Sequence, residues 1–322
     1  MFGWWCDFIL ALSLLTTLPA PTRLYDKPVV GATPRGRLDY KRDGPAQELA
    51  PTPAASALNM TRKTLRVGAT LRGRPNSGGR KGRQRGLPHS AAGSVRFFPL
   101  VGFIIGLILC IADRGLSLLF GPILKAALIL ALNVVLTGGL HLDGFIDTCD
   151  GLLSRQNREQ TLAILRDTHV GGLGAAALVT LLIVKFAVLV EISGRLRLWA
   201  LLLFPLMGRL SMSAAVCLFA YARPGAGMGR AYAQETGQRD LAVAVVISLL
   251  IVVVVCGYIK PSSKEVSIIL VAAALSLGGP YLLARRIAAK LGGLTGDVYG
   301  AINEVAELLF LLALAAGAAG LA

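Results

Sequence analysis

Seven apolar runs dominate the chain after Arg96, and polar connections separate them. Each run is close to the length that a helix needs to cross a bilayer, which is roughly 20 residues. The runs cover residues 97–112, 122–140, 171–190, 198–220, 241–258, 266–283 and 301–321. This pattern predicts an all-α protein, a polytopic transmembrane helical bundle of about seven spans.

Two segments of different character precede these runs. Residues 4–20 are apolar but short, with Asp7 near their start, so we expect residues 1–22 to form a short apolar or interfacial helix or a first membrane helix. Residues 23–92 are rich in Pro, Gly, Ser and Arg and show no apolar periodicity. Such a segment cannot bury enough apolar surface to offset its chain entropy, which predicts a basic, disordered insertion. The transmembrane domain is then residues 93–322.

Composition and charge support this division. The chain is 54% hydrophobic with a mean hydropathy of +0.64, whereas soluble domains are about 45–50% apolar. Five scattered cysteines form no metal-binding spacing, which favours a packing role. Residues 23–92 hold 15 Lys/Arg and 4 Asp/Glu, a net of +11 within a total of +15. We interpret this segment as a tail that either associates with membrane lipid or has no function, and any nucleic acid contact there would be nonspecific.

The connections between the runs differ in charge. Those at 23–96, 141–170, 221–240 and 284–300 carry most of the Lys and Arg, whereas the three on the other side are short and hold few charges. The positive-inside rule predicts that the basic set faces the cytoplasm. The chain is therefore expected in the cell (inner) membrane, multi-pass, with its polar motifs and its active face on the cytoplasmic side.

An acidic motif follows the second run. Asp143, Asp147 and Asp150 are spaced i, i+4, i+7, which places three carboxylates on one helical face. Such close anions repel one another, and a divalent cation removes that repulsion. Ligands that are all carboxylates suit Mg²⁺ or Mn²⁺ rather than zinc. With Asp167 from the next helical stretch, these residues are the predicted metal ligands; the alternative is a solvated acidic turn.

Further polar residues lie near this motif or in two later motifs. The candidates for catalytic proton transfer are His141, Asp147 and Asp167, although a histidine at this position can also have a purely structural role. Arginines suit a diphosphate, but the positive-inside bias explains any single one equally well. Acids in the last run can bind a ligand or simply complement a helix N-terminus. The predicted substrate-binding residues are Arg155, Arg166, Arg223, Asp297 and Glu304.

Six segments resemble the cobalamin synthase family, also called adenosylcobinamide-GDP ribazoletransferases. They are ALSLLTTLPAP (11–21), RFFPLVGFIIG (96–106), TGGLHLDGFIDTCDG (137–151), RDTHVGGLG (166–174), YARPGAGMG (221–229) and LGGLTGDVYGAINEVAEL (291–308). The resemblance covers almost the whole chain except about 23–92. Its central aspartate motif is specific, whereas the glycine-rich loop alone is not.

The resemblance implies a Mg²⁺-dependent phosphotransferase that assembles the nucleotide loop of cobalamin. Such an enzyme joins adenosylcobinamide-GDP to α-ribazole, or to its 5′-phosphate, and releases GMP. It implies that the four predicted ligands hold one or two Mg²⁺ ions that bridge the diphosphate. One of those carboxylates, or His141, would accept the ribazole proton, and Arg166 and Arg223 would steady the phosphates.

Two other functions fit parts of the pattern. A CDP-alcohol phosphotransferase that makes phospholipid shares the Asp-rich membrane face, but the chain lacks its later GxxxDxxxD pattern. A cation-coupled membrane transporter would place acids near the bilayer midplane and show repeated halves, whereas these acids lie at the ends of the runs. The sequence leaves open the phosphorylation of the ribazole, the lower base and whether the chain forms a homo-oligomer.

Overall fold

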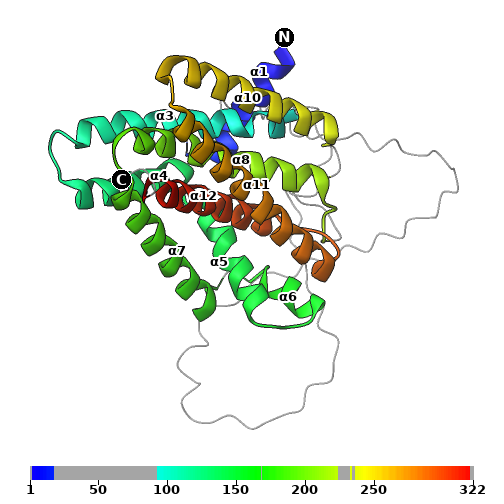
Figure 1. Cartoon of the computed structure of the whole chain (residues 1–322). Coiled ribbons are helices and arrows are strands. Elements are labelled where there is room, and N and C mark those ends of the chain that lie inside the picture. Colours follow the sequence, from blue (N-terminus) through cyan, green and yellow to red (C-terminus); the bar gives the residue numbers. More distant parts are fainter. Residues whose placement is uncertain (1, 18–92, 168, 224–232, 234–235, 320–322) are drawn as a thin grey trace, which may run out of the picture. The chain divides into compact units, whose positions relative to one another are not determined.

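The computed structural model describes residues 2–17, 93–167, 169–223, 233 and 236–319. Nearly all of them lie in helices (Figure 1). The helices are α1 (Phe2–Leu15), the 3₁₀ helix η2 (Ser94–Phe97), α3 (Phe98–Leu116), α4 (Pro122–Thr137), α5 (Leu140–Leu153), α6 (Arg158–Ile164), α7 (Gly172–Glu191), α8 (Gly194–Leu218), α10 (Gln238–Ile259), α11 (Ser263–Leu291) and α12 (Gly296–Ala319). The predictions for residues 23–92 and for most of the glycine-rich loop lie outside the described residues.

Within the described residues, six continuous helical segments are long and apolar enough to span a membrane. They are η2 with α3, and α7, α8, α10, α11 and α12. Helices α4 and α5 are long and apolar enough to span a membrane only when they are counted together, and the angle between them is 90°. The predicted all-α bundle of about seven spans is confirmed when this pair counts as one span. Helix α1 has 14 residues and is too short to cross a bilayer core.

The bend between α4 and α5 comes from two consecutive glycines. Gly138 (φ 59°) ends α4 and Gly139 (φ 71°) precedes α5, and both lie in the left-handed region that residues with a Cβ rarely adopt. The predicted span 122–140 therefore ends at Thr137. Because of the bend, the acidic motif lies on a separate helix that leaves the preceding span at a right angle.

Helix α8 lies at the centre of the described bundle and packs against α3, α10, α11 and α12. Helix α3 approaches it through Gly102 and Gly106, a GxxxG pair of the kind that brings membrane helices into close contact. A Cβ added at Gly106 would lie 2.5 Å from the carbonyl oxygen of Leu202, and one at Gly102 would collide with the carbonyl of Pro205. The backbones of α3 and α8 therefore touch along this stretch.

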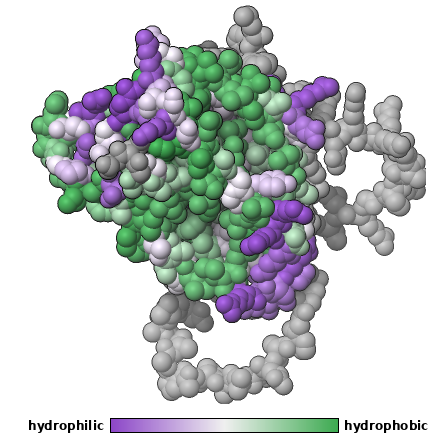
Figure 2. Space-filling view, viewed as in Figure 1, coloured by the Kyte–Doolittle hydropathy of each residue, from purple (hydrophilic) through white to green (hydrophobic). Residues whose placement is uncertain are grey.

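Polar residues gather at two ends of the bundle. Figure 2 shows hydrophilic surface over the α10–α11 turn and over α6 with the end of α11, and a largely hydrophobic surface between them. We call the second of these the site end; it comprises the α5–α7 connection, residues 219–223 after α8 and the α11–α12 connection. At the opposite end, Arg197 pairs with Asp113 (2.7 Å) and Arg195 donates to the carbonyl oxygens of Ile259 and Lys260.

Replacing Gly106 with leucine is expected to separate α3 from α8. The added side chain meets backbone atoms, which cannot rotate away, so we expect a loss of about 3 kcal/mol of unfolding free energy. Thermal unfolding in detergent measures it as a lower Tm. Gly115→Leu on the same helix is the matched control, because a Cβ there has no neighbour within 4 Å. Equal melting temperatures for the two variants would contradict close α3–α8 packing.

Candidate active site

Helices α5 and α12 cross through glycines, and this contact brings acids of both helices together. A Cβ added at Gly144 would lie 2.6 Å from the carbonyl oxygen of Asp297, and one at Gly300 would lie 3.1 Å from the carbonyl oxygen of His141. A larger residue at either position would push the helices apart. The N-terminus of α12, which carries Asp297, therefore lies against the acidic helix.

Asp147 is the centre of a cluster of four carboxylates. It is partly buried, and Asp297, Asp143 and Asp150 all act on it electrostatically. The one cation that acts on it in the same way, among the described residues, is Arg223. Three of these acids are the i, i+4, i+7 set of the sequence; Asp297, which the sequence assigned to substrate binding, joins them from α12. The cluster thus carries more negative charge than its own cation balances.

Arg223 holds Asp297 against two connections of the site end. Its Nη2 donates to Asp297 Oδ2 and to the carbonyl oxygen of Leu165, both at 2.7 Å. The segment that carries it is fixed by backbone pairing with Leu294, which accepts from Ala222 N and donates to Ala220 O, each at 2.8 Å. Arg223 therefore positions an acid of the cluster, and its predicted contact with substrate phosphate stays a prediction.

Asp150 caps the N-terminus of α7. Its carboxylate accepts hydrogen bonds from the amides of Gly171 and Gly174, both at 2.8 Å. A Cβ at either glycine would collide with this carboxylate, which explains the glycines of that segment. Capping from another helix fixes α7 against α5. Each carboxylate oxygen keeps a further lone pair, so the predicted role of Asp150 as a metal ligand stays a prediction.

The α5–α7 connection holds three other predicted site residues, all exposed: Arg155, Arg166 and Asp167. Asp167 Oδ1 lies 2.6 Å from His169 Nδ1, and this hydrogen bond and charge raise the pKa of His169. Arg155 and Arg166 pair with no acid within the described part of the chain, so their guanidinium groups are available to a ligand. Their predicted roles remain untested.

The cluster fits a hard divalent cation by charge and by donor type. Its donors are carboxylate oxygens, and binding of a cation would relieve the mutual repulsion of the acids. As the side chains are placed, no group of three or more His, Cys, Asp or Glu among the described residues is close enough to share an ion. Side chains of the cluster would have to move to gather around an ion, so the predicted metal set stays a prediction.

A buried network of charges lies deeper between α5, α7, α8 and α12. Lys185 Nζ donates to Glu304 Oε2 (2.6 Å) and to Glu307 Oε2 (2.8 Å). Arg209 pairs with Glu307 from α8, and the amide of Asn303 donates to both glutamates. Two positive and two negative charges balance, as an apolar environment requires. Glu304 is only 4% exposed and so lies away from solvent. Its predicted role in substrate binding stays a prediction.

His141 lies at the edge of this network. It is 2% exposed, and its Nδ1 is 3.5 Å from Arg209 Nη2, while its Nε2 has no hydrogen-bond partner within the described residues. Sequence reasoning missed Lys185 and Arg209, although a single cation inside an apolar run is a usable signal. Such a charge must find a partner on another helix.

Comparison with known proteins shows the family to which the chain is related. The family model described as cobalamin-5-phosphate synthase matches residues 82–315. A Thermoanaerobacter sp. (strain X514) protein named adenosylcobinamide-GDP ribazoletransferase is 37% identical over 216 residues, 67% of this chain and 83% of its own length. Proteins of the same name from Roseiflexus sp. (strain RS-1) and Clostridium novyi (strain NT) are 38% and 34% identical, over 69% and 70% of this chain and 78% and 86% of their own. No solved structure is significantly similar.

Removing one charge of the buried network is expected to lower the unfolding free energy more than removing two opposite charges. Lys185→Met leaves two buried glutamates with one cation, and we expect it to lower the unfolding free energy by about 3 kcal/mol. Lys185→Met combined with Glu304→Gln leaves the neutral pair of Arg209 and Glu307 and should recover most of that loss. Thermal unfolding of both variants in the same detergent measures this difference. A double variant less stable than the single one would contradict the network.

Proposed function

The chain belongs to the cobalamin-5-phosphate synthase family, and we propose that it joins adenosylcobinamide-GDP to α-ribazole or to its 5′-phosphate, with release of GMP. This reaction is the nucleotide loop assembly step of cobalamin biosynthesis. The observation that carries the proposal is the family match over residues 82–315, which includes the whole carboxylate cluster and Arg223. The names of the relatives, with 78–86% of their length aligned, agree with it.

The proposed reaction is one displacement at phosphorus. The ribazole hydroxyl oxygen forms a bond to the phosphorus that carries the cobinamide, and the bond from that phosphorus to the oxygen bridging it to GMP breaks. The hydroxyl proton goes to a base of the protein, and GMP leaves with the bridging oxygen. Little covalent chemistry falls to the protein, because such transfers depend mainly on positioning and on neutralising charge.

We propose that Asp143, Asp147 and Asp297 hold Mg²⁺, with Asp150 contributing through its remaining lone pairs. Bound there, Mg²⁺ would neutralise the diphosphate and the leaving phosphate. The charge excess around Asp147 and the all-carboxylate donors support this choice. Asp167 stays a predicted ligand, although its carboxylate is engaged by His169.

The protein's own groups would divide the remaining work. Asp147 is a better candidate base than His141, because it lies within the acid cluster while the imidazole is buried beneath it. Arg155 and Arg166 are exposed at the site end and are suited to hold substrate phosphates. Arg223 would act by positioning Asp297.

We place the site end in the cytoplasm and the protein in the cell (inner) membrane. The basic connections of the sequence support this orientation through the positive-inside rule. The reactants are nucleotides, which fits a cytoplasmic face. A CDP-alcohol phosphotransferase and a coupled transporter are less well supported, because the family match favours neither.

Asp147→Asn should abolish turnover while leaving the protein folded. The amide keeps the size of the side chain but removes its charge, so we expect a loss of about a thousandfold. The protein in nanodiscs receives adenosylcobinamide-GDP, α-ribazole and Mg²⁺, and GMP and cobalamin are quantified. EDTA should stop the reaction and added Mg²⁺ should restore it.

Glu191→Gln is the matched control for this experiment. It removes a carboxylate that is exposed at the opposite end of α7, and it should keep full activity. Turnover by Asp147→Asn at the rate of Glu191→Gln would refute the assigned site. Product from a CDP-alcohol, with none from the cobinamide substrate, would instead refute the function.

A further inference from the structure

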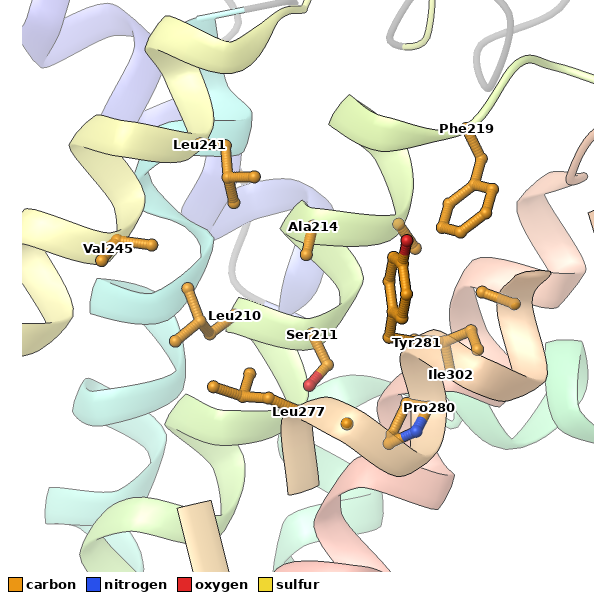
Figure 3. Close-up of a pocket in the computed structure, with 13 residues that line it drawn as sticks. Leu210, Ser211, Ala214, Phe219, Leu241, Val245, Leu277, Pro280, Tyr281 and Ile302 are labelled. Carbon is orange, nitrogen blue, oxygen red and sulfur yellow. The ribbon is translucent and has the colours of Figure 1, made fainter. Parts of the chain in front are cut away.

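An apolar cleft lies between the four helices α8, α10, α11 and α12. Its volume is about 330 Å³, and Figure 3 shows its lining side chains converging from α8, α10 and α11, with Ile302 from α12. Leu210 and Ala214 come from α8, Val245 from α10, and Leu277, Gly278 and Tyr281 from α11. The reaction proposed above uses none of these residues.

The geometry of α10 and α11 opens this cleft toward the lipid. Both helices pack on α8 but scarcely on each other, and they diverge from the short turn that joins them (Figure 1). They are also the least buried of the candidate spans, with 17% and 22% of their apolar windows buried. Apolar side chains exposed at membrane depth face hydrocarbon. The cleft is therefore a gap in the wall of the bundle that lipid can enter.

Positive charges flank the cleft at the site end. Arg285 follows the lining residue Ala284 and lies one turn beyond Tyr281, with Arg286 beside it. On the other wall, Arg239 lies two residues before the lining residue Leu241. All three arginines are exposed, and within the described residues none forms an ion pair. This end of the cleft therefore attracts an anion that has an apolar tail.

We propose that this cleft binds an anionic phospholipid of the leaflet at the site end. One acyl chain lies between α10 and α11 against α8, and the phosphate is held by Arg285 and Arg286. The volume suits one chain, since it lies at the lower limit of about 300–1,000 Å³ found for small-molecule sites. An apolar gap that ends in unpaired cations is complementary to this ligand class along its whole length. The proposal is independent of the reaction that the enzyme catalyses.

Gly278→Leu tests the apolar part of the site. A Cβ at Gly278 has no neighbour within 4 Å, so the leucine fills the cleft without displacing a helix. Gly257→Leu is the matched control, because it is an equally open glycine of α10 outside the cleft. Native mass spectrometry counts dioleoylphosphatidylglycerol and dioleoylphosphatidylcholine retained by each protein. We expect the affinity for phosphatidylglycerol to fall about tenfold in Gly278→Leu alone.

A second pair of variants tests the charged part. Arg285→Gln combined with Arg286→Gln should remove the preference for phosphatidylglycerol over phosphatidylcholine, whereas Lys264→Gln at the opposite end of α11 should keep it. Equal retention of both lipids by the unaltered protein would overturn the proposal, and so would unchanged retention in Gly278→Leu. If Gly278→Leu instead raised the KM for α-ribazole at constant lipid retention, the cleft would be a substrate site and the lipid assignment would be wrong.

Discussion

A charge inside a bilayer must be paired, and this constraint organises the core of the protein. Lys185 on α7 and Arg209 on α8 are both almost completely buried, and the glutamates of α12 neutralise them. The pairing fixes the rotation of α12 about its own axis and its depth in the bilayer. Rotating the helix would leave four charges without partners. The rest of the site is built on the helix that this network holds in place.

From that fixed helix, the glycines at the α5–α12 crossing determine where the acids meet. Gly144 and Gly300 allow the two backbones to touch, and the N-terminus of α12 then delivers Asp297 to the face that carries Asp143 and Asp147. Arg223 and the capping of α7 by Asp150 tie the neighbouring connections to the same place. If the acids bind a cation as proposed, these hydrogen bonds hold the negative charges close together in advance.

Sequence reasoning predicted the helical spans and the acidic face, since both follow from local periodicity. It missed the break at Gly138, because hydropathy continues across the glycines, although their pairing is itself a helix-end signal. It also missed the network of Lys185, since the two partners lie more than 100 residues apart in the chain. The roles in substrate binding that it assigned to Glu304 and Asp297 stay predictions. Spacing within one helix does not show which residues of another helix lie opposite.

The central claim is that α5 and α12 together form one acidic metal site. A titration with Mn²⁺, followed by electron paramagnetic resonance in nanodiscs, tests it without turnover. If the account is correct, Asp297→Asn weakens Mn²⁺ binding about tenfold or more, as Asp147→Asn does, and Glu191→Gln leaves it unchanged. If Asp297→Asn binds Mn²⁺ as tightly as the unaltered protein while Asp147→Asn does not, α12 contributes no ligand and the account is wrong.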